Sequence, residues 1–250
     1  MICLSGKVQR LDEICDIISK NPKEVPEETR KEFWRIVREI KKEKNPEESE
    51  IVKAAEIRDI LFDAERGGTY SLRITLAIEG ILGLLAVIGY LWALGFELNW
   101  LSIIGWNLNN WTIFVIRFLF VFAVIAFLYP FGRLIAGRWT GIRLLGMCRD
   151  QYYEPTLKID YVTFLKAQPA KRKWFFFFAG FWTIITSLWL GIIGLIINLD
   201  FTALIPAVLL MLFEGHVVLS GNSKASGGEM GHYNREKHIE KAWKKRTGVK

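Results

Sequence analysis

Cysteine is scarce in this sequence, and the sequence motifs of several common site chemistries are missing. The three cysteines, Cys3, Cys15 and Cys148, are far apart and include no CxxC pair, so we interpret them as reduced thiols rather than a disulfide framework. The chain also has no intact HExxH sequence, no Gly-x-Ser-x-Gly elbow and no glycine-rich phosphate loop. The sequence therefore predicts neither a metal site nor a cofactor.

Charge is almost absent from four long stretches, although charged residues make up 24% of the chain. A helix that crosses the hydrocarbon core of a bilayer needs about 20 apolar residues. The sequence therefore predicts an all-α, polytopic membrane protein with about four transmembrane helices. The expected spans are residues 74–96, 112–135, 174–197 and 201–219. The short turn at 198–200 makes the last two helices antiparallel neighbours.

Lysine and arginine are absent from two of the connections between these spans, at 97–111 and 198–200. Basic residues instead crowd the loop at 133–173 and the tail at 221–250, which is the asymmetry of cytoplasmic segments. We therefore expect a protein of the cell membrane with both termini in the cytoplasm. This distribution explains the net charge of +7 without a nucleic-acid partner. The expected partners are the bilayer, anionic lipid headgroups or another membrane protein.

The polar ends of the chain suggest two cytoplasmic parts beside the transmembrane domain at 71–220. Residues 1–70 form a small helical module, in which Phe33, Ile36, Val37 and Ile40 share one buried face. The tail at 221–250 is predicted to be an amphipathic helix at the membrane interface, with its apolar residues turned inward. Those residues are Ile239, Ala242 and Trp243. The tail histidines, His232 and His238, fall on different faces and do not form a zinc pair.

Ionisable and polar groups within or beside the spans are the candidates for a functional site, because each is costly in lipid unless paired. Five of them fall at one depth near the cytoplasmic side. They are Glu79, Tyr129, Arg133, Glu214 and His216. Arg133 could neutralise Glu79 or Glu214, either as a structural ion pair or within a functional pocket. Arg117 lies near the outer side, too far from Glu79 to pair, and is expected to reach the outer headgroups.

Residues 129–133, Tyr-Pro-Phe-Gly-Arg, followed by Ala136 and Gly141-Ile142, resemble a helix of the intramembrane site-2-type zinc proteases, which carries His-Glu-x-Gly-His. The basic collar at 169–173 and the next apolar span are similar in order, so the resemblance covers residues 128–219. Tyr129 and Arg133 stand at the histidine positions and Pro130 at the glutamate position. The resemblance therefore implies a membrane core that has lost its zinc ligands. Asp200 follows Asn198-Leu199 somewhat as the family's third ligand does, but on the opposite predicted face.

Three functions are compatible with these features, and whether the protein is an enzyme stays open. The leading hypothesis is a non-catalytic or regulatory membrane protein that holds a protein or lipid partner at the cytoplasmic membrane face. The alternative is a membrane enzyme that acts on lipid or peptide near the inner leaflet, with Glu79, Glu214 and His216 as acid, base or ligand groups. A small transporter is the third choice, because four helices make a narrow pathway.

Overall fold

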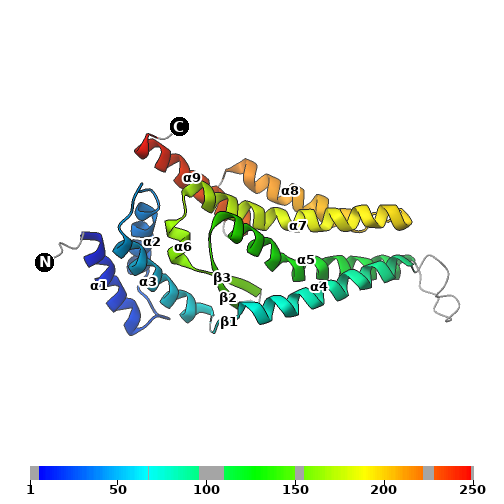
Figure 1. Ribbon diagram of the computed structural model, residues 1–250, viewed down its shortest axis with the longest axis horizontal. Coiled ribbons are helices and arrows are strands. Elements are labelled where there is room, and N and C mark those ends of the chain that lie inside the picture. Colours follow the sequence, from blue (N-terminus) through cyan, green and yellow to red (C-terminus); the bar gives the residue numbers. More distant parts are fainter. Residues whose placement is uncertain (1–5, 67, 96–109, 150–154, 222–227, 249–250) are drawn as a thin grey trace. The chain divides into compact units, whose positions relative to one another are not determined.

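The computed structural model describes residues 6–66, 68–95, 110–149, 155–221 and 228–248, and these residues are almost entirely helical (Figure 1). This confirms the predicted all-α class. The helices are α1 (Gly6–Lys20), α2 (Glu27–Ile40), α3 (Glu48–Arg66), α4 (Leu72–Leu94), α5 (Asn110–Thr140), α6 (Tyr161–Lys166), α7 (Pro169–Asn198), α8 (Leu204–Ser220) and α9 (Glu229–Thr247). The strands are β1 (Tyr70–Ser71), β2 (Leu144–Arg149) and β3 (Pro155–Ile159).

Three helices, α4, α5 and α7, are long and apolar enough to cross a membrane. The fourth predicted span, α8, is apolar but has only 17 residues. At 1.5 Å per residue it is roughly 26 Å long, near the lower limit for a bilayer core of about 30 Å. Helices α5 and α7 extend beyond the predicted spans, because their polar flanks continue the same helices.

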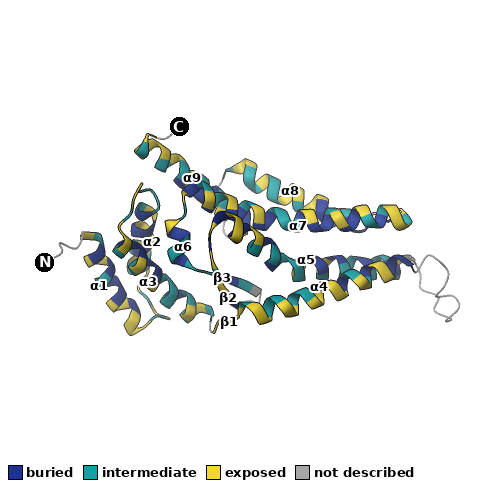
Figure 2. Cartoon of the chain, in the orientation of Figure 1, coloured by how far each residue is buried: buried dark blue, intermediate teal, exposed yellow. Residues whose placement is uncertain are grey.

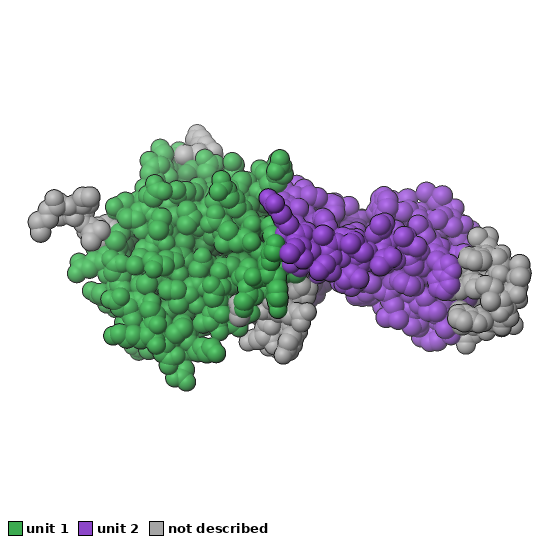
Figure 3. Space-filling view, turned by 60° about the horizontal axis from the view of Figure 1, so that its bottom comes forward, with its two compact units in different colours: residues 1–72, 136–175, 232–250 green, residues 73–135, 176–231 purple. Residues whose placement is uncertain are grey.

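The chain divides into two compact units, coloured separately in Figure 3. Unit 1 contains residues 1–72, 136–175 and 232–250, and unit 2 contains residues 73–135 and 176–231. Unit 1 therefore combines the N-terminal module with most of the basic loop and most of the tail. Unit 2 contains most of each long apolar helix.

The N-terminal module buries one face of each of its three helices. On α2 the buried residues are Phe33, Ile36, Val37 and Ile40, which confirms the predicted face. On α1 and α3 the buried apolar residues are Val8, Leu11, Ile14, Cys15, Ile18, Ile51, Ala54, Ala55, Ile57 and Leu61. Cys15 and Cys148 are free and buried, as the interpretation as reduced thiols requires, and burial raises the pKa of the Cys148 thiol. Cys3 lies outside the described residues.

A small antiparallel sheet of order β1-β2-β3 was not predicted, because such short strands leave no clear alternating pattern. Tyr70 pairs with Met147 and Ser71 with Gly146. A Cβ atom at Gly146 would lie 2.5 Å from the carbonyl oxygen of Tyr70, so only glycine permits this approach. Since β1 runs directly into α4 and β2 follows α5, the pairing holds the start of α4 near the end of α5.

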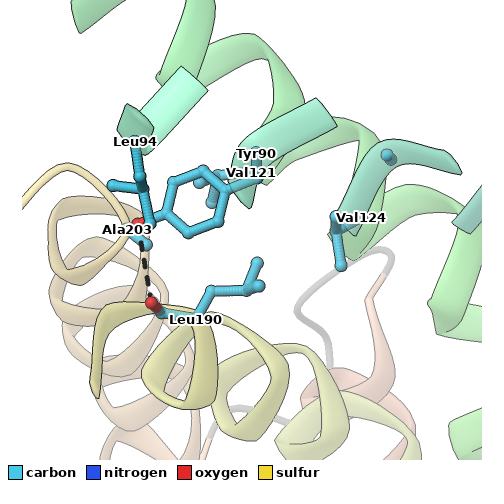
Figure 4. Close-up of a cluster of buried hydrophobic side chains, with 7 residues drawn as sticks. Tyr90, Leu94, Val121, Val124, Leu190 and Ala203 are labelled. Carbon is cyan, nitrogen blue, oxygen red and sulfur yellow. Dashed lines mark hydrogen bonds between the residues drawn. The ribbon is translucent and has the colours of Figure 1, made fainter. Parts of the chain in front are cut away.

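Unit 2 contains a tight apolar cluster, shown in Figure 4. Its buried residues are Ala86, Tyr90, Leu94, Val121, Val124, Leu190 and Ala203, from α4, α5, α7 and the residue before α8. Elsewhere these helices expose apolar residues, as the yellow segments along α4 and α8 in Figure 2 show. On α4 the exposed residues Ile74, Ile78, Ile81, Leu85 and Ile88 recur at helical spacing. Such a continuous apolar stripe is typical of a lipid-facing surface.

Candidate functional site

Tyr129 and Arg133 lie one turn apart on α5 and both bind Glu229, the first residue of α9. The Nε atom of Arg133 donates to Oε1 of Glu229 at 2.8 Å. The Nη2 atom of Arg133 and the hydroxyl of Tyr129 donate to the same oxygen. The side chains of Arg133 and Glu229 are only 11% and 8% exposed. The three residues, here called the Glu229 anchor, therefore form a buried, charge-neutral group within unit 2.

The sequence of α5 suits close packing around this anchor. Pro130 has no N–H, so one backbone hydrogen bond of α5 is missing, yet the helix continues to Thr140. Gly132 lies directly against the side chain of Trp182 on α7. The indole Nε1 of Trp182 donates to the carbonyl oxygen of Leu128 at 2.9 Å. A glycine on α5 and a tryptophan on α7 thereby fix the distance between the two helices beside the anchor.

Gly180 performs the same role between α7 and the start of α9. A Cβ atom at this position would lie 3.1 Å from Cβ of Glu229 and 3.0 Å from Cε of Met230. A side chain at position 180 would require Glu229 and Met230 to shift by a few tenths of an ångström. Gly180 therefore permits the close packing of Glu229 and Met230 against α7.

The two oxygens of the Glu229 carboxylate have different surroundings. Oε1 accepts all three hydrogen bonds of the anchor, whereas Oε2 is buried and has no hydrogen-bond partner among the described residues. Glu214 on α8 is half-buried and close enough to Glu229 for their like charges to interact. A buried carboxylate is costly without a counter-charge, and the guanidinium of Arg133 supplies that charge next to Oε1 of Glu229.

The structure brings together some of the five predicted site residues and separates others. Tyr129 and Arg133 meet, and Glu214 lies near them through its interaction with Glu229. Among the described residues, no hydrogen bond or ion pair joins Glu79 or His216 to the anchor, and His216 is exposed. The predicted partner of Arg133, Glu79 or Glu214, is therefore wrong, because a residue of the tail supplies the counter-charge.

Sequence reasoning missed Glu229 because it assigned the tail to the membrane interface. The available signal was an acidic residue directly after Gly227-Gly228, ahead of a strongly basic helix. Acidic residues suit the first turn of a helix, so Glu229 had an ordinary local explanation. Its contact with α5 joins residues about a hundred positions apart, which periodicity cannot reveal.

The anchor offers a phenol, a guanidinium and a carboxylate, a donor set that does not fit zinc. Zinc in proteins takes neutral imidazoles, thiolates and carboxylates, and a guanidinium cation beside the same oxygen would repel it. Within the described ranges, no three His, Cys, Asp or Glu side chains gather as a metal site would require. What this arrangement can do is hold the start of α9 against α5.

A second buried ion pair joins Arg117 of α5 to Asp200, just after α7. Nη1 of Arg117 lies 3.0 Å from Oδ1 of Asp200, and the two residues are 4% and 8% exposed. Arg117 also donates to the carbonyl oxygens of Ala93 and Leu94 at 3.2 and 3.5 Å. The prediction that Arg117 reaches the outer headgroups is therefore wrong, because the protein itself satisfies the guanidinium.

Asp200 is held from two further sides. The hydroxyl of Tyr90 donates to Oδ2 at 3.1 Å, and the hydroxyl of Thr202 donates to Oδ1 at 2.8 Å. Tyr90 also reaches the carbonyl oxygen of Leu190, the dashed line in Figure 4. A Cβ atom at Gly194 would lie 2.5 Å from the Tyr90 hydroxyl, so glycine is needed here. The group joins α4, α5, α7 and the turn before α8. Its role is therefore structural, because it holds these helices together.

The tail helix α9 packs on protein in unit 1, which corrects its predicted place at the membrane interface. Ile239 is buried, and the indole of Trp243 donates to the carbonyl oxygen of Glu43 at 3.0 Å. Glu236 is buried between Lys41, at 2.6 Å, and Arg172, at 2.8 Å. Burial raises the pKa of Glu236, but these two cations outweigh it and the net pKa is lowered.

Arg172 is almost fully buried at the start of α7. It donates to Glu236 and to the carbonyl oxygens of Leu165 and Ala167, at 3.3 and 2.7 Å. It also donates to the carbonyl oxygen of Lys41 at 2.9 Å. This predicted collar residue therefore joins three sequence-distant segments of unit 1.

Comparison of the chain with family models, with curated proteins and with solved structures finds no match. The described residues form an essentially all-α membrane protein with three helices of spanning length.

Proposed function

We propose that this is a multi-pass protein of the cell membrane that is non-catalytic or regulatory and holds a protein or lipid partner at the cytoplasmic face. The one-sided distribution of lysine and arginine supports cytoplasmic termini. With α8 as a short fourth span, the number of crossings is even. The pairing of β1 with β2 agrees with antiparallel α4 and α5, because it joins the start of one to the end of the other.

The Glu229 anchor is the observation that carries the non-catalytic part of this proposal. Tyr129 and Arg133 stand where the site-2-type zinc proteases, which the segment resembles, carry their two histidines. Here both side chains hold Glu229 of the same chain. The place of a metal and its water is thus taken by an internal carboxylate. We interpret the protein as a degenerate relative whose former reaction centre has become an attachment point.

The attachment of Glu229 to α5 fits a protein that holds partners, because it fixes one end of α9. Helix α9 begins in unit 2 with Glu229 and continues through unit 1. Within unit 1 it is fastened by Glu236 to Lys41 and Arg172. One helix is therefore tied by buried ion pairs in both units. A partner that binds unit 1 would act on a helix whose first residue is fixed to α5.

Metal content and proteolysis test the non-catalytic part. The chain is purified in detergent without added metal, as wild type, as Tyr129→Phe and as the surface control Tyr70→Phe. We expect zinc far below one equivalent in all three and no chelator-sensitive cleavage of membrane-inserted peptide substrates. One equivalent of zinc in wild type and in Tyr70→Phe, lost in Tyr129→Phe, would contradict the proposal.

Site-specific photo-crosslinking in cells tests partner holding. A photoreactive residue replaces exposed positions of unit 1, such as Trp34 and Val52, and an exposed lipid-facing position, Leu84, serves as a control. We expect position-dependent adducts with a protein or with phospholipid from unit 1. If unit 1 gives no adduct at any exposed position, while Leu84 still crosslinks to lipid, the holding function is refuted.

A membrane enzyme is the second candidate, and one observation favours it. The like charges of Glu214 and Glu229 interact, and Oε2 of Glu229 carries no hydrogen bond from the described residues. Two carboxyl groups in one low-dielectric region are a common basis for acid–base chemistry. In that case Glu214→Gln would abolish conversion of a lipid or peptide substrate while leaving thermal stability unchanged.

A further inference from the structure

Exposed aromatic, aliphatic and basic residues lie on adjoining segments of the backbone where α5 ends and the sheet begins. They form what we call the interface patch, Tyr70, Arg138, Trp139, Arg143 and Leu145, and all belong to unit 1. Tyr70, Trp139 and Leu145 are 62%, 61% and 50% exposed. A group of exposed large apolar side chains with basic residues among them is typical of a surface that contacts a membrane or another protein.

Local backbone structure brings the segments that carry these residues close to one another. Helix α5 ends at Thr140, where Gly141 has a φ of 80° and the N–H of Ile142 returns to the carbonyl oxygen of Gly137 at 3.0 Å. The chain therefore reverses directly after Trp139 and enters β2. The pairing of Ser71 with Gly146 then brings β1, including Tyr70, beside the start of β2.

Leu145 is exposed because of an irregularity in the sheet. Leu144 pairs with Ile159 and Gly146 pairs with Lys158, so Leu145 is the extra residue of a β-bulge. A bulge commonly changes the direction in which a side chain points. Here it leaves a leucine at the surface, next to Arg143, where a regular strand pairing would have given it a partner residue across the sheet.

The patch is continuous with two membrane-crossing helices. Trp139 lies in the last turn of α5, and Tyr70 precedes Leu72, the first residue of α4, by two positions. Both residues therefore lie within two positions of the end of a helix that is long and apolar enough to cross a membrane. Tryptophan and tyrosine favour this depth, where the ring meets hydrocarbon and its polar edge meets headgroups.

The charge of the patch selects the occupant. Arg138 and Arg143 are exposed, and in the described part of the chain neither has an acidic partner. The five patch residues include no acid. A positive surface with exposed apolar side chains at a span end is complementary to an anionic headgroup whose acyl chain lies in the bilayer.

We propose that the interface patch binds anionic phospholipid of the cytoplasmic leaflet, with Arg138 and Arg143 on the phosphate and Trp139 and Leu145 among the glycerol and upper acyl-chain atoms. This rests on the proposed function, because it names the lipid class and the surface on the predicted cytoplasmic side. Each arginine contributes about five-fold in affinity for the anionic lipid, the factor that corresponds to about 1 kcal/mol.

A depth measurement tests the placement of the patch. The full chain, with Cys3→Ser, carries a spin label on Leu145→Cys in nanodiscs of phosphatidylcholine with or without phosphatidylglycerol. Cys15 and Cys148 are buried and serve as the unlabelled background. We expect the Leu145 label to collide with oxygen more often, and with a water-soluble nickel chelate less often, than a label on Val52→Cys of α3. Equal, fully aqueous behaviour at both sites would overturn the proposal.

An affinity measurement tests the lipid class. Phosphatidylglycerol is titrated into the protein in neutral detergent, and stabilisation against heat reports binding. The double variant Arg138→Gln with Arg143→Gln should bind phosphatidylglycerol about 25-fold more weakly, since the two five-fold factors multiply. The control double variant Lys31→Gln with Arg35→Gln, at exposed positions of α2, should bind it as wild type does. An equal loss of response in both double variants indicates general charge attraction and overturns the site.

In the depth measurement, a Leu145 label that is shielded only in a dimer or by a protein partner would show that the occupant is not lipid.

The two proposals fail in different ways. An aqueous Leu145 label refutes lipid binding at the patch but leaves a protein partner of unit 1 possible. Stoichiometric zinc or proteolysis at Tyr129 refutes the non-catalytic function but does not affect the lipid titration. Each result therefore identifies the proposal that it contradicts.

Discussion

Replacing Arg117 by methionine should be among the most destabilising single changes in unit 2. The guanidinium is 4% exposed and binds Asp200 at 3.0 Å as well as the carbonyl oxygens of Ala93 and Leu94. Arg117→Met retains much of the length of the side chain but leaves the Asp200 carboxylate buried without a counter-charge. Removing one partner of a buried ion pair costs about 3–5 kcal/mol. For a chain of this length that corresponds to a fall of roughly 6–20 °C in melting temperature.

The companion variants separate the charge from the hydrogen bonds. Tyr90→Phe removes the hydroxyl that contacts Oδ2 of Asp200 and the carbonyl oxygen of Leu190, leaves the ion pair in place, and should cost about 1 kcal/mol. Arg117→Met with Asp200→Leu removes both charges and should recover most of the stability lost in Arg117→Met, because no ion remains buried. Arg73→Met, at an exposed position of α4, is the matched control and should change little.

Melting is followed by circular dichroism in one detergent at fixed pH, and repeated in nanodiscs. The reasoning is refuted if Arg117→Met has the melting temperature of the wild type, or if the double variant is no more stable than Arg117→Met alone. The first result would place Arg117 in contact with solvent or headgroups, as the sequence suggested. The second would assign the effect to packing rather than to charge.

Three further predictions follow from the other ion pairs and from the topology. Glu229→Ala should lower the free energy of unfolding by about 3 kcal/mol because it leaves Arg133 buried without a counter-charge. Glu79→Ala should change the free energy of unfolding by less than about 1 kcal/mol. A larger loss in Glu79→Ala than in Glu229→Ala would contradict the role of the Glu229 anchor. The net pKa of Glu236 lies below its ordinary value of about 4.3, so its stabilising contribution is present at neutral pH and is lost as pH falls below that value. Glu236→Gln should therefore flatten the acid limb of the stability profile, measured by melting from pH 7 to pH 3, and an unchanged acid limb would disprove this. An impermeant maleimide should label Leu199→Cys, 76% exposed in the turn after α7, in intact cells, and Lys31→Cys only after membrane disruption; labelling in the opposite order would reverse the proposed orientation.

The amino-acid sequence was sufficient for features that depend on neighbouring residues. Long apolar runs with very few charges predicted helices in the regions of α4, α5, α7 and α8, because a helix must be about 20 residues long to cross the hydrocarbon core. The repeat of Phe33, Ile36, Val37 and Ile40 predicted the buried face of α2 for the same reason. Tyr129 and Arg133 were recognisable as a pair, since four residues apart on a helix means one face.

Only the tertiary structure decided which residues complete these local features. The counter-charge of Arg133 proved to be Glu229, and that of Arg117 proved to be Asp200, each far away along the chain. The strands of the sheet were too short to produce a pattern of their own, and the tail helix turned its apolar face to protein instead of lipid. The local sequence indicates that an apolar side chain needs a packing partner and that a buried charge needs a counter-charge. Many groups along the chain could supply either one. The choice among them follows from how the helices pack, because a buried charge is stable only where the folded chain brings its counter-charge within a few ångströms.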